Sequence, residues 1–128
     1  MQVELRDLML SDPAISSIVG GRIDWGVSPQ GSAMPRVVMQ IIGNNGQVFL
    51  FSGGSGFYTA RVQINCYGET YGAAAGLAGA VKDLLDVYQA GIFLGVFCVS
   101  ERDEYAGGVT DAPRIFGKQL DFIINWSK

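Results

Sequence analysis

The stretch ARVQINCYGETYGAAAGLAGAVKDLL, residues 60–85, changes its hydrophobic period halfway along. Up to Cys66, apolar residues alternate with polar ones, which is the period of a half-buried strand. From Thr70 onward the spacing becomes helical, with Thr70 suited to cap the helix and Gly91 suited to end it. One stripe of this helix carries Leu77, Val81, Leu84, Leu85 and Tyr88. The stretch therefore predicts a strand that leads directly into the main helix of the chain.

Three glycines, Gly72, Gly76 and Gly79, lie in the first half of this predicted helix. Each glycine costs up to about 1 kcal/mol relative to alanine in a helix interior. We therefore expect another backbone to approach closely there, either the sheet beneath the helix or a neighbouring subunit. The sheet of the same chain is the preferred partner.

The N-terminal twenty residues predict a short helical arm. Residues 3–10 have amphipathic spacing, with acidic residues in the early turns. A second short helix, or a continuation of the first after a break, follows. Ser11 or Asp12 can cap it, Pro13 suits its first position and Gly20 ends it.

Strands are predicted on both sides of the main helix. Before it, residues 23–25 form a brief extended piece and residues 36–42 a strongly apolar strand. Asn45-Gly46 is a turn signal, so residues 47–51 are expected to return as the second strand of a hairpin.

After the helix, an apolar strand begins near Ile92 and leads into the charged group Glu101 to Glu104. The last strand shows alternation, with Phe116, Leu120, Phe122, Ile124 and Trp126 on its apolar face, which Lys118 interrupts. The order of elements predicts an α+β fold, a mainly antiparallel sheet packed by one long helix plus a short N-terminal helical arm. At 128 residues we expect a single domain, residues 1–128.

Composition limits the function. Hydrophobic residues make up 48% and charged residues only 16%, which suggests that some apolar surface is meant for neighbouring subunits. The net charge of −3 does not favour binding of nucleic acid or an anionic membrane, and no membrane span or signal peptide is expected. There is no histidine, the usual metal ligand and catalytic base. Cys66 and Cys98 lie in apolar strand-like runs and are interpreted as free thiols.

Two segments are candidates for a chemical site. FLFSGGSGFY, residues 49–58, is rich in glycine, but no helix with a Lys and Ser/Thr follows, so a phosphate cradle is not expected. Phe49, Phe51 and Phe57 are instead candidate apolar anchors around a glycine-rich tip.

The acidic group near residue 101 is the other candidate. Consecutive strand residues point to opposite faces, so its carboxylates should not form a catalytic pair. Arg102, Asp103 and Glu104 are interpreted as a solvated or intersubunit ion-pair patch. No catalytic residue, metal ligand or cofactor site is predicted, and an enzyme is not expected.

The chain resembles the small tail-completion, or tail-terminator, proteins of long-tailed phages and gene transfer agents. The resemblance covers nearly the whole chain. It rests on GGRIDWGVSPQG at residues 20–31, which contains Trp25, on MPRVVMQ at residues 34–40, and on QINCYGETYGAAAGLAGAV at residues 63–81. The order and spacing of these pieces carry the resemblance, and no catalytic motif accompanies them.

This resemblance implies a structural protein of the virion, assembled in the host cytoplasm. It implies a six-fold ring on the head-proximal end of the tail tube, which stops tube polymerisation and joins the tube protein to the head-tail connector, or stopper. Double-stranded DNA would pass through the opening without specific binding. The candidate interface residues are Trp25, Phe49, Phe51, Phe57, Arg102, Asp103 and Glu104. The alternatives are another ring-forming connector or tail-tube protein and, further away, a small ligand-binding module.

Overall fold

The computed structural model describes residues 1–27, 33–48, 57–106 and 115–127. The helices are α1 (Gln2–Ser11), α2 (Pro13–Val19) and α3 (Tyr71–Leu85). The strands are β1 (Ile23–Trp25), β2 (Arg36–Val48), β3 (Phe57–Gly68), β4 (Tyr88–Ala90), β5 (Phe93–Ala106) and β6 (Ile115–Trp126).

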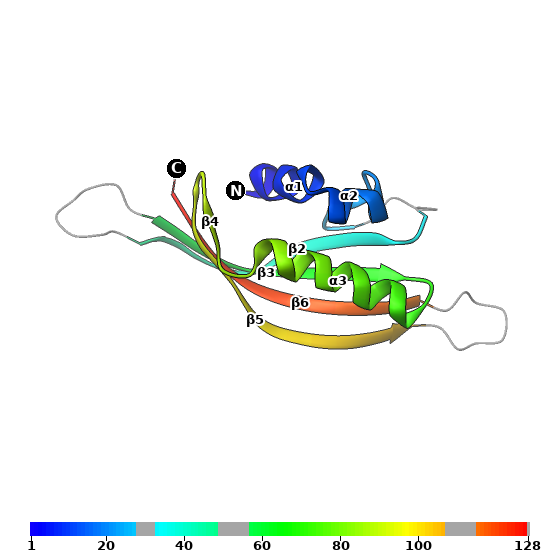
Figure 1. Cartoon of the computed structure of the whole chain (residues 1–128). Coiled ribbons are helices and arrows are strands. Elements are labelled where there is room, and N and C mark those ends of the chain that lie inside the picture. The colour runs from blue at the N-terminus through cyan, green and yellow to red at the C-terminus, as the bar shows by residue number, and fades with distance from the viewer. Residues whose placement is uncertain (28–32, 49–56, 107–114, 128) are drawn as a thin grey trace.

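The six strands form one sheet in the order β1-β2-β3-β6-β5-β4. All neighbours pair antiparallel except β1 and β2, which are parallel. All three helices lie on the same face of the sheet, and no described element covers the other face (Figure 1). The α+β prediction is confirmed, and the helical layer consists of the main helix α3 together with the two short N-terminal helices α1 and α2.

The core lies between this helical layer and the two central strands. Val62 pairs with Phe122 and Ile64 with Leu120, so these side chains point to the same side of the sheet, and all four are fully buried. The predicted inward direction of the last strand is confirmed, because Phe122, Ile124 and Trp126 all belong to the core. Alternation alone therefore assigned the buried face of β6 correctly.

The predicted helix caps are also confirmed. The side chain of Asp12 accepts a hydrogen bond from the Ala14 N–H at 3.0 Å, with Pro13 in the first turn of α2. Gly20 ends α2 with a positive φ of 61°. Thr70 caps α3 by accepting from the Ala73 N–H at 3.0 Å. Both N-terminal helices contribute fully buried residues to the main core, so they are an integral part of the helical layer.

The turn predicted at Asn45-Gly46 is wrong. Strand β2 continues through these residues to Val48, and its pairing with β3 shifts register between Ile41 and Gly43 and again between Asn44 and Gly46. A bulge can absorb an extra residue while pairing continues on either side. Here the long partner strand β3 keeps the segment extended, which outweighs the local turn preference.

The predicted end of the main helix is wrong as well. Helix α3 ends at Leu85, and Tyr88 pairs with Val96 in strand β4. Val87 has a positive φ of 63°, and its N–H donates to the Val96 carbonyl at 2.7 Å. Gly91, with φ 58°, falls between β4 and β5 and does not end a helix.

The glycines of α3 do not face the sheet, so the preferred sequence interpretation of them is wrong. A Cβ built on Gly72, Gly76 or Gly79 would meet no atom within 4 Å. The close approach occurs instead at Gly68, where a Cβ would lie 2.8 Å from the Ala74 nitrogen and 2.9 Å from the Ala73 Cβ. Gly68 thus permits the tight connection from β3 into α3.

Candidate protein-interaction site

The charged group Glu101 to Glu104 lies inside β5, where it pairs with the first half of β6. Glu101 is opposite Leu120 and Asp103 opposite Lys118, on the face that carries the helices. Arg102 is opposite Gln119 and Glu104 opposite Gly117, on the uncovered face. The neighbouring carboxylates Asp103 and Glu104 therefore point to opposite sides of the sheet, whereas Glu101 and Asp103 share the helical side.

On the helical side, a group of four ionised side chains and one tyrosine joins α3 to β5 and β6. We call Tyr71, Lys82, Glu101, Asp103 and Lys118 the helix-side cluster. The Lys118 Nζ lies 2.7 Å from an Asp103 oxygen and 3.6 Å from a Glu101 oxygen. The Lys82 Nζ lies 2.8 Å from Glu101, and the Tyr71 hydroxyl donates to Asp103 at 3.2 Å. The cluster therefore fastens α3 to the charged part of the sheet.

These contacts shift the acid-base equilibria in a consistent direction. The hydrogen bond from Lys82, helped by the charges of both lysines, lowers the pKa of Glu101. The hydrogen bond from Lys118 lowers the pKa of Asp103, and that same bond raises the pKa of Lys118. Carboxylates held this way stay ionised at neutral pH, which suits ion pairing and does not suit a general acid.

The cluster predicts a particular loss of stability in acid. Because the folded-state pKa values of Glu101 and Asp103 lie below their ordinary values, their stabilisation is present above those ordinary values and is lost as the pH falls through the folded-state values. Lys118→Met should remove much of this pH-dependent stabilisation. The difference in melting temperature between wild type and this variant should be largest near pH 6 and shrink below about pH 4. A difference that stays constant with pH would show that Lys118 acts only through packing.

On the uncovered face, a second group of polar side chains surrounds Asp121. We call Arg61, Arg102, Glu104, Gln119 and Asp121 the sheet-side cluster. Asp121 is only 2% exposed, and its Oδ2 lies 3.0 Å from an Arg61 nitrogen and 3.8 Å from an Arg102 nitrogen. Arg102 donates to Gln119 at 3.1 Å, and Gln119 donates to Glu104 at 2.9 Å. The buried Oδ1 of Asp121 has no hydrogen-bond partner among the described residues.

Other polar and apolar residues extend this face. Gln63 donates to Asn65 at 3.0 Å, and Asn65 is 4% exposed. Phe97 pairs with Ile123 on the same side of the sheet, yet its ring is 44% exposed. The uncovered face thus combines arginines and amides with an exposed aromatic ring, the composition of a protein-protein contact.

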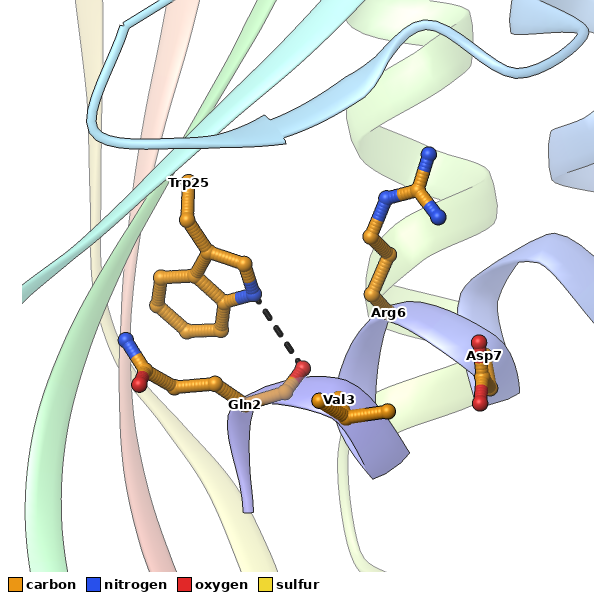
Figure 2. Close-up of a pocket in the computed structure, with 5 residues that line it drawn as sticks. All are labelled: Gln2, Val3, Arg6, Asp7 and Trp25. Atoms are coloured by element: carbon orange, nitrogen blue, oxygen red, sulfur yellow. Dashed lines mark hydrogen bonds between the residues drawn. The ribbon is translucent and has the colours of Figure 1, made fainter.

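Trp25 lies apart from both clusters, on the edge strand β1. Its indole Nε1 donates to the Gln2 carbonyl at 3.1 Å, which ties β1 to the start of α1 (Figure 2). Arg6 strengthens this link by donating to the Ile23 carbonyl at 2.7 Å. A pocket of about 330 Å³ is lined by Gln2, Val3, Arg6, Asp7 and Trp25. The half-buried indole has a clear structural role there.

The sequence-predicted interface residues therefore do not meet in one place. Arg102 and Glu104 lie on the uncovered face, Asp103 lies on the helical face, and Trp25 lies near the opposite edge of the sheet. Phe49 and Phe51 lie outside the described residues. Phe57 begins β3 opposite Val48, and its side chain also lies outside the described part.

Sequence reasoning missed Arg61 and Asp121, the centre of the sheet-side cluster. They are separated by 60 positions and meet only through the pairing of β3 with β6. In the sequence, Asp121 is recognisable only as an acidic residue in the alternating final strand. That pattern predicts an outward-facing side chain but not its partner.

Neither a metal-binding cluster nor a membrane-spanning helix occurs among the described residues. In the part of the chain that the structure describes, no three Cys, Asp or Glu residues gather in a way that could hold a metal ion. None of the described helices has the length and apolar character needed to cross a membrane.

Comparisons with known proteins agree with this picture of a structural subunit. The sequence model of the family described as tail completion protein gp17 matches residues 3–101. Among solved structures, a chain of the "virion of native gene transfer agent (GTA) particle" has a similar fold, with a TM-score of 0.70 at 13% sequence identity. The similarity covers 100% of this chain and 95% of that chain. No curated protein sequence matches the chain.

Proposed function

Because the chain belongs to the tail completion protein gp17 family and is a structural protein of a phage-type tail, we propose that it caps the head-proximal end of the tail tube. In this proposal several copies form a ring, which stops polymerisation of the tube and presents the surface to which the head-tail connector binds. The genome passes through the opening of the ring.

The observation that carries this proposal is the family match over residues 3–101, which includes both N-terminal helices, α3 and half of β5. The composition supports it in physical terms. A chain with 16% charged residues leaves apolar surface for neighbouring subunits, and a net charge of −3 does not attract DNA to the wall of a channel. The carboxylates of the helix-side cluster are ion-paired, so their chemistry also favours a structural role.

The test is to produce particles without this protein and to examine them by electron microscopy. We expect tails of uncontrolled length that are not attached to filled heads, together with a fall of several orders of magnitude in DNA transfer. Complementation with the wild-type chain should restore both properties. Tails of normal length that join heads normally would contradict the proposal.

The number of copies in purified particles separates this function from its closest alternatives. A terminator should be present as one ring per particle, whereas a tail-tube protein should be present in many rings. Quantitative mass spectrometry against a tube protein of the same particle measures the ratio. A copy number similar to that of the tube protein would favour the tube assignment.

A further inference from the structure

The two outer surfaces of the subunit differ in a way that suggests how copies contact each other. One surface is the uncovered face of the sheet, with the sheet-side cluster and the exposed ring of Phe97. This face has three arginines, including Arg36, whose guanidinium lies 5.6 Å from the centre of the Tyr67 ring. Lysine is absent from this face among the described residues. Arginine and aromatic residues are enriched at protein interfaces, whereas lysine is depleted.

One member of the sheet-side cluster, Asp121, is more buried than a solvent-facing position requires. Asp121 is 2% exposed, and its Oδ1 is without a hydrogen-bond partner among the described residues. A buried carboxylate oxygen without a partner is costly, and a donor from an incoming chain would remove that cost. Phe97, 44% exposed in the same face, would lose its contact with water in the same event.

The other surface is the outer side of α3. Gly72, Gly76, Gly79 and Asp83 follow one another at intervals of four, three and four residues, so they lie along one stripe of the helix. The buried residues of α3 occupy the opposite side, among them Leu77 and Val81. Within the described part of the chain, nothing lies within 4 Å of a Cβ built on any of these glycines.

We propose that the outer stripe of α3 in one subunit packs on the uncovered sheet face of the next subunit. This inference rests on the proposed ring. A cyclic ring requires two different surfaces on each chain, which meet head to tail, and these two surfaces lie on opposite sides of the subunit. Each α3 would then be held between two sheets, its own and that of its neighbour.

The two surfaces are complementary in shape and charge. The glycines leave the helix without side chains along the stripe, so its backbone can approach the neighbouring sheet closely. Asp83 at the end of the stripe is exposed and would face Arg61 and Arg102, whose side chains are 45% and 55% exposed. This arrangement gives the α3 glycines the role that packing within the chain does not supply.

The sharpest test is Gly76→Gln, because this variant should keep or raise the stability of the isolated subunit and weaken formation of the ring. Glutamine is a better helix former than glycine, and the position is open, so the melting temperature of the isolated subunit should stay the same or rise by a few degrees. Ring formation, measured as mass with and without tail tubes, should weaken roughly thirtyfold or more.

A second pair of variants tests the sheet side. Phe97→Glu should leave the subunit folded and prevent ring formation, since it places a charge in the centre of the contact. Val3→Glu is the matched control, because Val3 is 69% exposed but lies on α1 in the helical layer, where it should not affect this contact. Ring formation by both the Phe97→Glu and the Gly76→Gln variants would overturn the proposed contact. It would also be overturned if Val3→Glu lost ring formation while those two variants kept it.

Cross-linking shows the direction of the contact. In a Cys98→Ser background, Gly76→Cys and Phe97→Cys combined in one chain should give a ladder of disulfide-linked multimers upon oxidation. Mixing the two single variants should give only dimers that contain one copy of each. Dimers of a single variant with itself would contradict a head-to-tail contact. If the wild type forms no ring under any condition, the proposed function itself fails, whereas wild-type rings that all variants also form reject only this interface.

Discussion

Phe122→Ala is expected to lower the free energy of unfolding by about 3–5 kcal/mol, because it removes the largest fully buried side chain of the core. Phe122 lies on the central strand β6, opposite Val62 of β3 and Cys98 of β5, so the cavity would lie in the middle of the sheet beneath the helical layer. A loss of this size is a large part of the stability of a typical domain. Urea unfolding followed by circular dichroism measures it.

Ile123→Ala is the matched control, one residue further along the same strand. Its side chain points to the uncovered face and is only half-buried, so the expected loss is below about 1.5 kcal/mol. Equal losses in the two variants would mean that the assignment of faces along β6 is incorrect. Trp126, 8% exposed and stacked on Tyr58 at 5.4 Å, should behave more like Phe122 than like Ile123.

Gly68→Ala is expected to destabilise the subunit by about 1–3 kcal/mol through steric overlap. Its new methyl group would lie 2.8 Å from the Ala74 nitrogen, a backbone atom that can yield only if the start of α3 moves. Thr70, which caps this helix, would be displaced together with it. Thermal unfolding of the isolated subunit measures the effect.

Gly79→Ala makes the same chemical change within α3 and should have the opposite sign. A methyl group at this position meets no atom within 4 Å, so the variant should gain about 0.5–1 kcal/mol from helix propensity. If both alanine variants are destabilised, Gly79 must contact another part of the isolated subunit, and the outward orientation of this side of α3 would be incorrect. The pair therefore tests the orientation of the helix directly.

Much of the local structure could be predicted because it depends on neighbouring residues. Asp12, Pro13 and Gly20 mark the limits of α2, and Thr70 marks the start of α3. The hydrogen bonds that Asp12, Gly20 and Thr70 make there span only two to four residues. The alternation in β6 assigned Phe122 and Trp126 to the core, because side chains on a strand point to alternate faces.

Two of the errors arose because pairing with a distant strand outweighed a local preference. Asn45-Gly46 is a good turn sequence, but pairing with β3 keeps it in β2. Tyr88 fits the helical stripe, but its pairing with Val96 places it in β4. In both cases hydrogen bonds to a partner strand are worth more than an intrinsic preference, which is a weak influence on its own.

By itself the sequence determined the α+β class, the helix caps, the inner face of the last strand and the separation of the acidic residues in β5 onto two faces. These properties follow from periods of 2 and 3.6 residues and from contacts within one turn. Only the tertiary structure decided that Asp121 meets Arg61 and Arg102, that Lys118 joins Asp103, and that the glycines of α3 face outward. The register between β3, β6 and β5 brings these residues together from distant positions. A short stretch of sequence does not specify which strand will pair with it.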